Sequence, residues 1–89
     1  MAWSIELTPI AKKGLKKLSP QNAQRILNFL FNRLANLDDP RLIGEALKGS
    51  ELSGFWKYRV GDYRIISEIK DDIVRILVVK VGHRREVYR

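Results

Sequence analysis

Residues 55–69 read FWKYRVGDYRIISEI, and this stretch decides the fold. Apolar and polar residues alternate on both sides of Gly61-Asp62, and alternation with a period of two is typical of β-strands. Glycine is common in two-residue hairpin turns because it accepts the positive φ that such turns need. We therefore predict two antiparallel strands, over residues 55–60 and 63–70, joined by a tight turn at this dipeptide.

A third apolar segment follows, over residues 73–81. Asp71-Asp72 separates it from the preceding strand, so the spacing predicts a second two-residue turn and a three-stranded meander. Counting outward from the turns gives the register. The expected pairs are Val60–Tyr63, Arg59–Arg64 and Lys57–Ile66 across the first turn, and Ile69–Val74, Glu68–Arg75 and Ile65–Val78 across the second.

The meander then has two different faces, because successive side chains of a strand point to opposite sides. The face expected in the core carries Trp56, Tyr58, Val60, Tyr63, Ile65, Ile69, Val74, Ile76 and Val78. The other face mixes basic and apolar residues: Lys57, Arg59, Arg64, Glu68, Arg75, Ile66, Leu77, Val79 and Val81. The same alternation predicts that His83 lies on this second face, beside Val81.

The first half of the chain predicts one strand and two helices. Trp3, Ile5 and Leu7 alternate within residues 2–7, as in a short strand. Thr8-Pro9 and Ser19-Pro20 are both helix-start signals, with an N-cap followed by proline at the first helical position. Apolar residues then recur at helical spacing, Ala11, Leu15 and Leu18 in the first helix and Ala23, Ile26, Leu27, Leu30 and Leu34 in the second.

Residues 41–48 are expected to add a short helical turn before Gly49. The order of elements is then strand, helix, helix, strand, strand, strand. We predict one α+β domain over residues 1–89, in which a two-helix hairpin packs on one face of a mainly antiparallel sheet.

The chain is strongly basic, with 17 Lys and Arg against 10 Asp and Glu and a net charge of +7. This surplus favours nucleic acid or an acidic protein as a partner, and a basic domain without such a partner is the alternative. The absence of cysteine and a single histidine predict no disulfide, no metal site and no cofactor. The chain shows neither a membrane-length apolar segment nor the order of a signal peptide, so we expect no membrane contact and a cytoplasmic location.

Arg59 directly opposite Arg64 is a local conflict, because like charges paired across strands are unfavourable by about 0.2–1 kcal/mol. A phosphate held between the two cations removes the repulsion, whereas side chains splayed into water are the simpler explanation. Apolar residues on the same face favour a shallow nucleic-acid groove, in which they lie under sugars and bases. Gly82 permits a kink that turns Arg84 and Tyr88 toward this groove.

Three stretches together resemble the RelE branch of the RelE/ParE toxin superfamily over the whole chain: FWKYRVGDYRIISEI, ILVVKVGHRREVY and the preceding ALKGSELSGFW. The resemblance implies a toxin of a type II toxin–antitoxin system that cleaves mRNA in the ribosomal A site and so inhibits translation. Its implied partners are the ribosome, mRNA and an acidic, RelB-like antitoxin. We expect the antitoxin to cover the lysine-rich surface of residues 12–17 or the groove itself. The implied enzyme is a metal-independent endoribonuclease, in which the ribose 2′-OH attacks the adjacent phosphate.

The resemblance also implies a catalytic set, which consists of Lys57, Arg64, His83, Arg84 and Tyr88. Arg64 and Arg84 are expected to neutralise the phosphorane, because guanidinium groups strengthen their hold as charge develops. The general acid and base are expected among Lys57, His83 and Tyr88, and their assignment stays open. The residues expected to bind substrate are Arg59, Arg75, Arg85 and Arg89. Glu51 and Glu68 are the candidate carboxylates of the site, and we expect Glu68 to pair with Arg75.

Two other functions fit the same residues. The ParE branch shares the fold and often a basic tail, but it poisons DNA gyrase by binding and has no need of Lys57 or Tyr88. A basic nucleic-acid-binding module without chemistry is the third possibility. An assay in a purified system would separate the three functions, because the first predicts ribosome-dependent mRNA cleavage, the second predicts gyrase inhibition and the third predicts neither.

Overall fold

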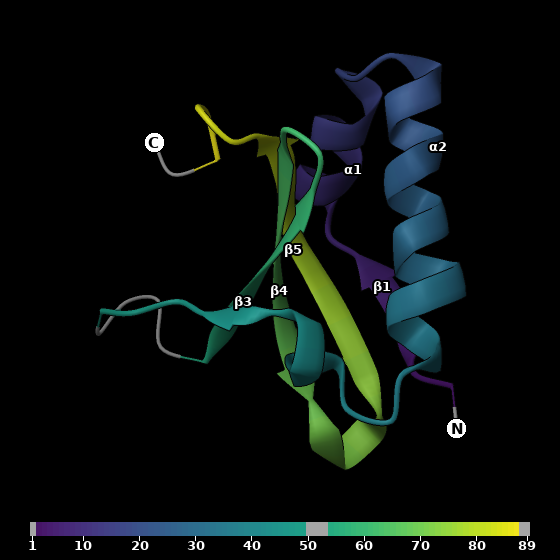
Figure 1. Ribbon diagram of the computed structural model, residues 1–89, viewed down its shortest axis with the longest axis vertical. Helices are drawn as coiled ribbons and strands as arrows, with labels where there is room; N and C mark the ends of the chain where they lie inside the picture. Colours follow the sequence, from purple (N-terminus) through teal and green to yellow (C-terminus); the bar gives the residue numbers. More distant parts are fainter. Residues whose placement is uncertain (1, 50–53, 88–89) are drawn as a thin grey trace.

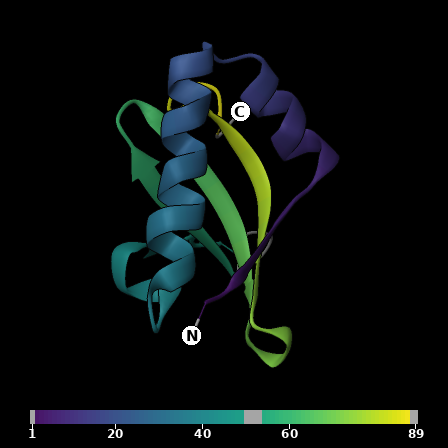
Figure 2. The same cartoon turned by 90° about the vertical axis from the view of Figure 1, so that its right-hand side faces the viewer.

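The computed structural model describes residues 2–49 and 54–87. Its strands form one five-stranded sheet in the order β1-β5-β4-β3-β2, and two helices lie on one face of that sheet (Figures 1 and 2). β1 pairs with β5 in parallel, and the other neighbours are antiparallel. The α+β class and the helices on one face are as predicted. The strands are β1 (Ser4–Leu7), β2 (Glu45–Ala46), β3 (Phe55–Val60), β4 (Tyr63–Lys70) and β5 (Arg75–His83).

Both helices begin at the predicted Thr-Pro and Ser-Pro signals. In α1 (Pro9–Lys16) the Thr8 Oγ1 accepts a hydrogen bond from the Ala11 N–H at 3.1 Å. In α2 (Pro20–Asn28) the Ser19 Oγ accepts one from the Asn22 N–H at 3.3 Å. The second helix continues as a π-helical stretch, η1 (Phe29–Arg33), and a 3₁₀ turn, η2 (Leu34–Asn36).

The hydrophobic core lies between these helices and the sheet. Both predicted helical stripes contribute to it, and α1 approaches β5 so closely that a Cβ on Gly14 would lie 2.2 Å from the Val81 carbonyl oxygen. Of the sheet residues predicted in the core, Ile69 and Val74 are the two that do not belong to it. The others are buried or pack against it: Trp56, Tyr58, Val60, Tyr63, Ile65, Ile76 and Val78.

The first hairpin has the predicted register, with Arg59 opposite Arg64. The second does not, because its loop has four residues rather than two: η4 (Asp71–Ile73) is a 3₁₀ turn, and Val74 takes a φ of 50°. A two-residue turn needs positive φ at its first position, which glycine supplies and aspartate adopts less readily. Glu68 consequently pairs with Leu77, and the predicted pairing with Arg75 was wrong.

A β-bulge shifts the register again within the second hairpin. Ile66 pairs with Lys80 and Ser67 with Val78, so Val79 is the extra residue of β5. The longer loop moves the register by two residues, so each side chain stays on its predicted face of the sheet. The bulge moves the register by one residue, so every side chain of β5 after Val79 points to the face opposite to the predicted one. Val81 is therefore buried in the core, 4% exposed, and its predicted place on the groove face was wrong.

The segment between the helices and β3 holds an element that the sequence did not predict. The helical turn predicted over residues 41–48 is present only at its start, as the 3₁₀ helix η3 (Pro40–Ile43). The two-residue strand β2 then pairs with β3, placing Glu45 beside Lys57 and Ala46 beside Trp56. Within the described residues, no helix is both long and apolar enough to span a bilayer.

Candidate functional site

A cleft of about 570 Å³ lies on the sheet face that points away from the helices. Its walls come from η3, β2, β3, β4 and the turn that follows β5. Five of its lining residues are cations and one is a carboxylate, so the cleft suits an anionic ligand. The lining residues are Ile43, Glu45, Lys57, Tyr58, Arg59, Arg64, Arg84 and Arg85.

Arg64 is anchored in the cleft by two hydrogen bonds of its own. Its Nη1 donates hydrogen bonds to the carbonyl oxygens of Gly61 at 3.0 Å and Tyr63 at 2.9 Å. Its side chain points away from the core because its strand neighbours Tyr63 and Ile65 point into it. Arg59, its cross-strand partner, is more exposed. The guanidinium of Arg64 is thus held in place before any ligand arrives.

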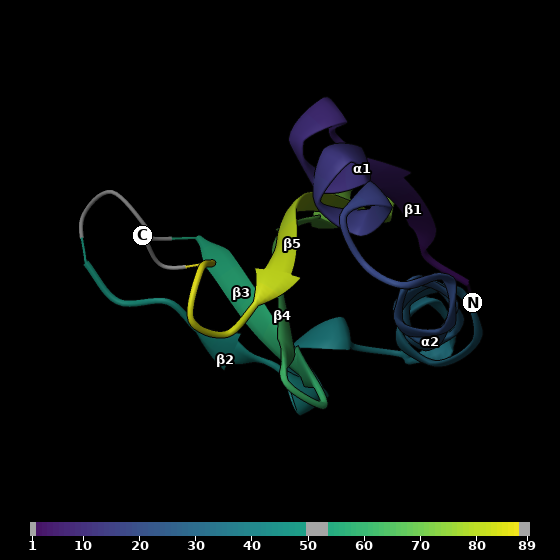
Figure 3. The same ribbon diagram turned by 90° about the horizontal axis from the view of Figure 1, so that it is seen from above.

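Arg84 and Arg85 reach the cleft through a turn after β5. Figure 3 shows the chain curling from the end of β5 toward β3. The Arg84 N–H donates to the Asp62 carbonyl oxygen at 2.8 Å, which ties this turn to the β3–β4 loop. The N–H groups of Glu86 and Val87 donate to the His83 carbonyl oxygen at 2.8 and 3.1 Å. The same loop therefore anchors Arg64 through its side chain and Arg84 through its backbone.

Glu45 and Lys57 meet at one edge of the cleft. The Lys57 Nζ lies 3.1 Å from the Glu45 Oε2, and their side chains are 34% and 71% exposed. Sequence reasoning missed Glu45, because nothing in its neighbourhood marks it and only the pairing of β2 with β3 brings it here. Glu68, one of the two predicted carboxylates, instead lies 3.5 Å from the Lys70 Nζ and does not line the cleft. Glu51, the other one, lies outside the described residues.

His83 does not lie in this cleft. It lines a second pocket, of about 580 Å³, between α1 and the end of β5. Its ring centroid is 5.8 Å from that of Tyr63 in an edge-to-face arrangement, and its Nδ1 accepts a hydrogen bond from the Arg85 N–H at 3.2 Å. The bulge at Val79 is the physical reason, because it turns both Val81 and His83 to the helix side. The prediction that His83 shares a face with the groove was therefore wrong.

The remaining predicted residues divide between the cleft and other places. Arg75 lies at the start of β5, where its Nη1 is 3.6 Å from the Glu6 Oε2, and it does not line the cleft. Tyr88 and Arg89 lie outside the described residues. The structure thus brings together five of the predicted residues: Lys57, Arg59, Arg64, Arg84 and Arg85.

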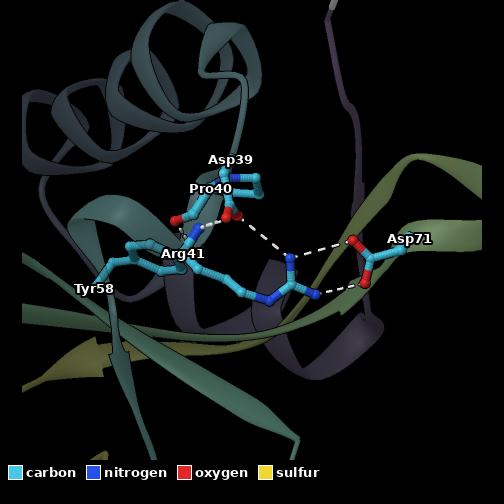
Figure 4. A network of polar contacts seen from close by, with 5 residues as sticks. All are labelled: Asp39, Pro40, Arg41, Tyr58 and Asp71. Atoms are coloured by element: carbon cyan, nitrogen blue, oxygen red, sulfur yellow. Dashed lines mark hydrogen bonds and ion pairs between the residues drawn. The ribbon is translucent and has the colours of Figure 1, made fainter.

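A polar network supports the cleft at its η3 wall (Figure 4). The buried Tyr58 hydroxyl donates to the Pro40 carbonyl oxygen at 2.8 Å, and burial raises the pKa of Tyr58 to about 12. Arg41 hydrogen-bonds both oxygens of Asp71, at 3.2 and 2.5 Å, and one oxygen of Asp39 at 3.3 Å. The hydrogen bond from Arg41 lowers the pKa of Asp71 below its ordinary value. Trp56 adds a cation–π contact, with its ring centroid 5.9 Å from the Arg41 Cζ.

The fold is that of small toxins from type II toxin–antitoxin systems. A chain of the RelBE2 toxin–antitoxin complex of Mycobacterium tuberculosis superimposes with a TM-score of 0.86 at 27% identity, covering 94% of this chain and 100% of that one. A chain of the archaeal RelE–RelB complex from Pyrococcus horikoshii gives a TM-score of 0.75 at 24% identity, with 98% and 100% covered.

The sequence comparisons agree with the fold. Toxin RelG of Mycobacterium tuberculosis is 30% identical over 89 residues, which cover 100% of this chain and 99% of that protein. Toxin RelE of the same organism is 29% identical over 87 residues, covering 98% and 87%. The family model of the ParE toxin of type II toxin–antitoxin systems matches residues 5–88. The chain therefore belongs to the RelE/ParE toxin superfamily, as a RelE/RelG-like toxin of a type II toxin–antitoxin system.

Proposed function

We propose that this toxin is an endoribonuclease that cleaves mRNA in the ribosomal A site and so stops translation. The observation that carries the proposal is the cleft, in which Arg64 from β4 and Arg84 from the turn after β5 meet the Lys57–Glu45 pair. Guanidinium groups from separate elements suit a phosphodiester, because each presents paired N–H donors to phosphate oxygens. The resemblance to toxins named RelE and RelG supports the same choice.

In the proposed reaction the ribose 2′-oxygen attacks the adjacent phosphorus, and the bond from phosphorus to the 5′-oxygen breaks. A base takes the 2′-OH proton, an acid protonates the 5′-oxygen, and a 2′,3′-cyclic phosphate remains. Arg64 and Arg84 neutralise the charge that builds on the phosphorane, which is the largest single contribution in many such sites. Arg59 and Arg85, at the rim, bind the neighbouring phosphates.

We assign the base to Glu45. Among the described residues it is the only carboxylate that lines the cleft, and a carboxylate can accept the 2′-OH proton directly. Lys57 lies 3.1 Å from it as its ion-pair partner, which suits a cation that orients the base and binds phosphate. This assignment replaces Lys57 and His83 as base candidates.

We assign the acid to Tyr88, four residues beyond Arg84 in the chain. The resemblance to RelE-type toxins carries this role. Arg89 is proposed as a further RNA contact for the same reason. His83 and Arg75 receive no role in the reaction, because one faces the second pocket and the other lies at the far end of β5.

We further propose that an acidic, RelB-like antitoxin neutralises the toxin. Several similar structures are toxin–antitoxin complexes, including the RelBE2 complex and the intact Escherichia coli RelBE complex. Charge complementarity supports such a partner, because this chain carries a net charge of +7. We expect it to bind on two surfaces, the cleft and the lysine-rich surface of α1. The lysines of the second surface are Lys12, Lys13 and Lys16 of α1 and Lys17 directly after it.

Primer extension on mRNA in a purified translation system tests the proposal. We expect cuts within the A-site codon that need ribosomes and persist in the presence of EDTA at a constant free magnesium concentration. Equal cutting of naked RNA at the same toxin concentration would refute the ribosome requirement. The family model is that of ParE toxins, so DNA gyrase supercoiling is assayed in parallel. Gyrase inhibition without mRNA cuts would assign the chain to the gyrase-poison branch.

A further inference from the structure

The carboxylate of the cleft stands on a strand that is too short to fix its own position. β2 has two residues, and both are exposed. Its ladder consists of Glu45 opposite Lys57 and Ala46 opposite Trp56, followed by one hydrogen bond from the Leu47 N–H to the Phe55 carbonyl oxygen at 3.0 Å. Edge strands of this length gain little from pairing alone. Besides its ion pair with Lys57, the position of Glu45 therefore depends on what holds the segment before it.

An arginine within that segment, residues 39–44, ties it to a distant loop. Arg41 reaches a residue 30 positions away, because its guanidinium binds both oxygens of Asp71 in the β4–β5 loop. It also binds Asp39, whose Oδ1 accepts a second hydrogen bond from the Arg41 N–H at 3.0 Å. A bidentate guanidinium–carboxylate pair sets orientation as well as distance. Figure 4 shows the guanidinium lying between the two carboxylates.

The link from Arg41 to Glu45 passes through a single residue. The Gly44 N–H donates to the Arg41 carbonyl oxygen at 3.2 Å, and Gly44 directly precedes Glu45. Gly44 lies against the Tyr58 ring so tightly that a Cβ there would be 2.8 Å from the Tyr58 Cε1. Tyr58 in turn holds the same segment through its hydrogen bond to the Pro40 carbonyl oxygen.

We infer that Arg41 is a positioning residue for Glu45: its ion pairs to Asp71 and Asp39 fix the η3 segment so that the Glu45 carboxylate faces the cleft. The inference rests on the proposed function, in which Glu45 is the base. Arg41 does not line the cleft and touches no RNA in this role. Its loss should lower the rate of the cleavage step and leave the affinity for programmed ribosomes unchanged. A misplacement of about 1 Å can lower a rate by about 10²-fold, so we expect a loss of 10- to 10²-fold for Arg41→Gln.

A double-mutant cycle separates positioning from general support of the fold. Arg41→Gln, Glu45→Gln and the double variant are compared in single-turnover cleavage, with Arg33→Gln, an exposed arginine on η1, as the matched control. If Arg41 acts through Glu45, the double variant cleaves as slowly as Glu45→Gln alone. Losses that multiply would overturn the inference. Arg41→Lys, which keeps the charge without the bidentate geometry, should recover part of the rate.

A second measurement does not depend on catalysis. Amide hydrogen exchange at Leu47, the hydrogen bond next to β2, should accelerate in Arg41→Gln and stay unchanged in Arg33→Gln. Unchanged exchange in both would overturn the positioning role, whatever the activity. If Arg41→Gln fails to fold, Asp71→Asn removes the same pair from the other side and must give the same two results. Wild-type protein without cleavage on ribosomes would refute the proposed function, while the exchange measurement still decides the positioning role.

Discussion

Two strand arginines that look alike in sequence should behave differently when each is replaced by alanine. Arg64 lines the cleft with its guanidinium anchored to two carbonyl oxygens, whereas Arg75 lies outside it beside Glu6. Removing one preorganised charge-stabilising donor from an active site lowers the rate by about 10²–10³, or about 2.7–4 kcal/mol of transition-state stabilisation. We expect that loss for Arg64→Ala and a rate close to wild type for Arg75→Ala.

The effect on folding should be small for both variants. Arg64→Ala loses two hydrogen bonds, at about 0.5–1.5 kcal/mol each, but it relieves the repulsion from Arg59 by about 0.2–1 kcal/mol. The net loss of about 0–3 kcal/mol is below the 5–15 kcal/mol of a typical domain. Arg75→Ala loses one partly exposed ion pair, which contributes about 0–1 kcal/mol. Both proteins should therefore remain folded, and a difference in activity between them reports on the site.

Single-turnover cleavage on programmed ribosomes is the assay, with urea unfolding of each variant as the check on folding. Arg64→Lys adds a test of geometry, because a lysine keeps the charge but lacks the paired donors. It should recover only part of the lost rate. Near-wild-type cleavage by Arg64→Ala, or an equal loss in Arg75→Ala, would refute the assignment of the cleft as the place of the chemistry.

Four further outcomes are expected. Gly14→Ala should lower the free energy of unfolding by about 1–3 kcal/mol, because the alanine Cβ would overlap the Val81 carbonyl oxygen. This loss should exceed the gain of about 1 kcal/mol from the higher helix propensity of alanine, and an unchanged urea midpoint would contradict the close approach. The pKa of Tyr58 in the folded protein is about 12, against an ordinary 10.0, so its contribution to stability is present below pH 10 and should be lost as the pH rises toward 12. In denaturation experiments across this pH range, Tyr58→Phe should not show that loss of stability. His83→Ala should cleave at nearly the wild-type rate, and a loss of about 10² or more, the range of an acid–base residue, would argue that His83 enters the cleft during the reaction. Antitoxin affinity, measured by calorimetry, should fall as salt rises from about 0.1 to 0.5 M, and an insensitive affinity would argue against an electrostatic interface.

Local chemistry was enough to predict the helices and the first hairpin. A capping hydroxyl followed by proline begins a helix whatever packs on it, and a glycine at the first turn position sets the register of β3 and β4 by counting. The Arg59–Arg64 pair followed from that count alone. The part of the cleft that β3 and β4 build was therefore readable from residues 55–69.

The rest depended on interactions that counting does not reach. The bulge at Val79 leaves no mark in an unbroken apolar run, yet one extra residue reverses the direction of His83. The Val79 carbonyl oxygen accepts a hydrogen bond at 2.8 Å from the Thr8 hydroxyl, and Thr8 is 71 positions away in the chain. Glu45 was missed for a similar reason, because a two-residue strand has no periodicity and is placed by Arg41 and Tyr58.

The place of β5 in the sheet sets the order in which the molecule can be completed. Among the described strands β5 comes last in the chain, yet it lies between β1 and β4, so β1 cannot join the sheet until residues 75–78 have been synthesised. Contacts between such distant parts of a chain form late and slow the folding of a domain. The turn that carries Arg84 follows β5 directly, so the cleft can gain that cation only after β5 has been synthesised. A partly made chain therefore has the lysines of α1 and the first hairpin but not the assembled cleft.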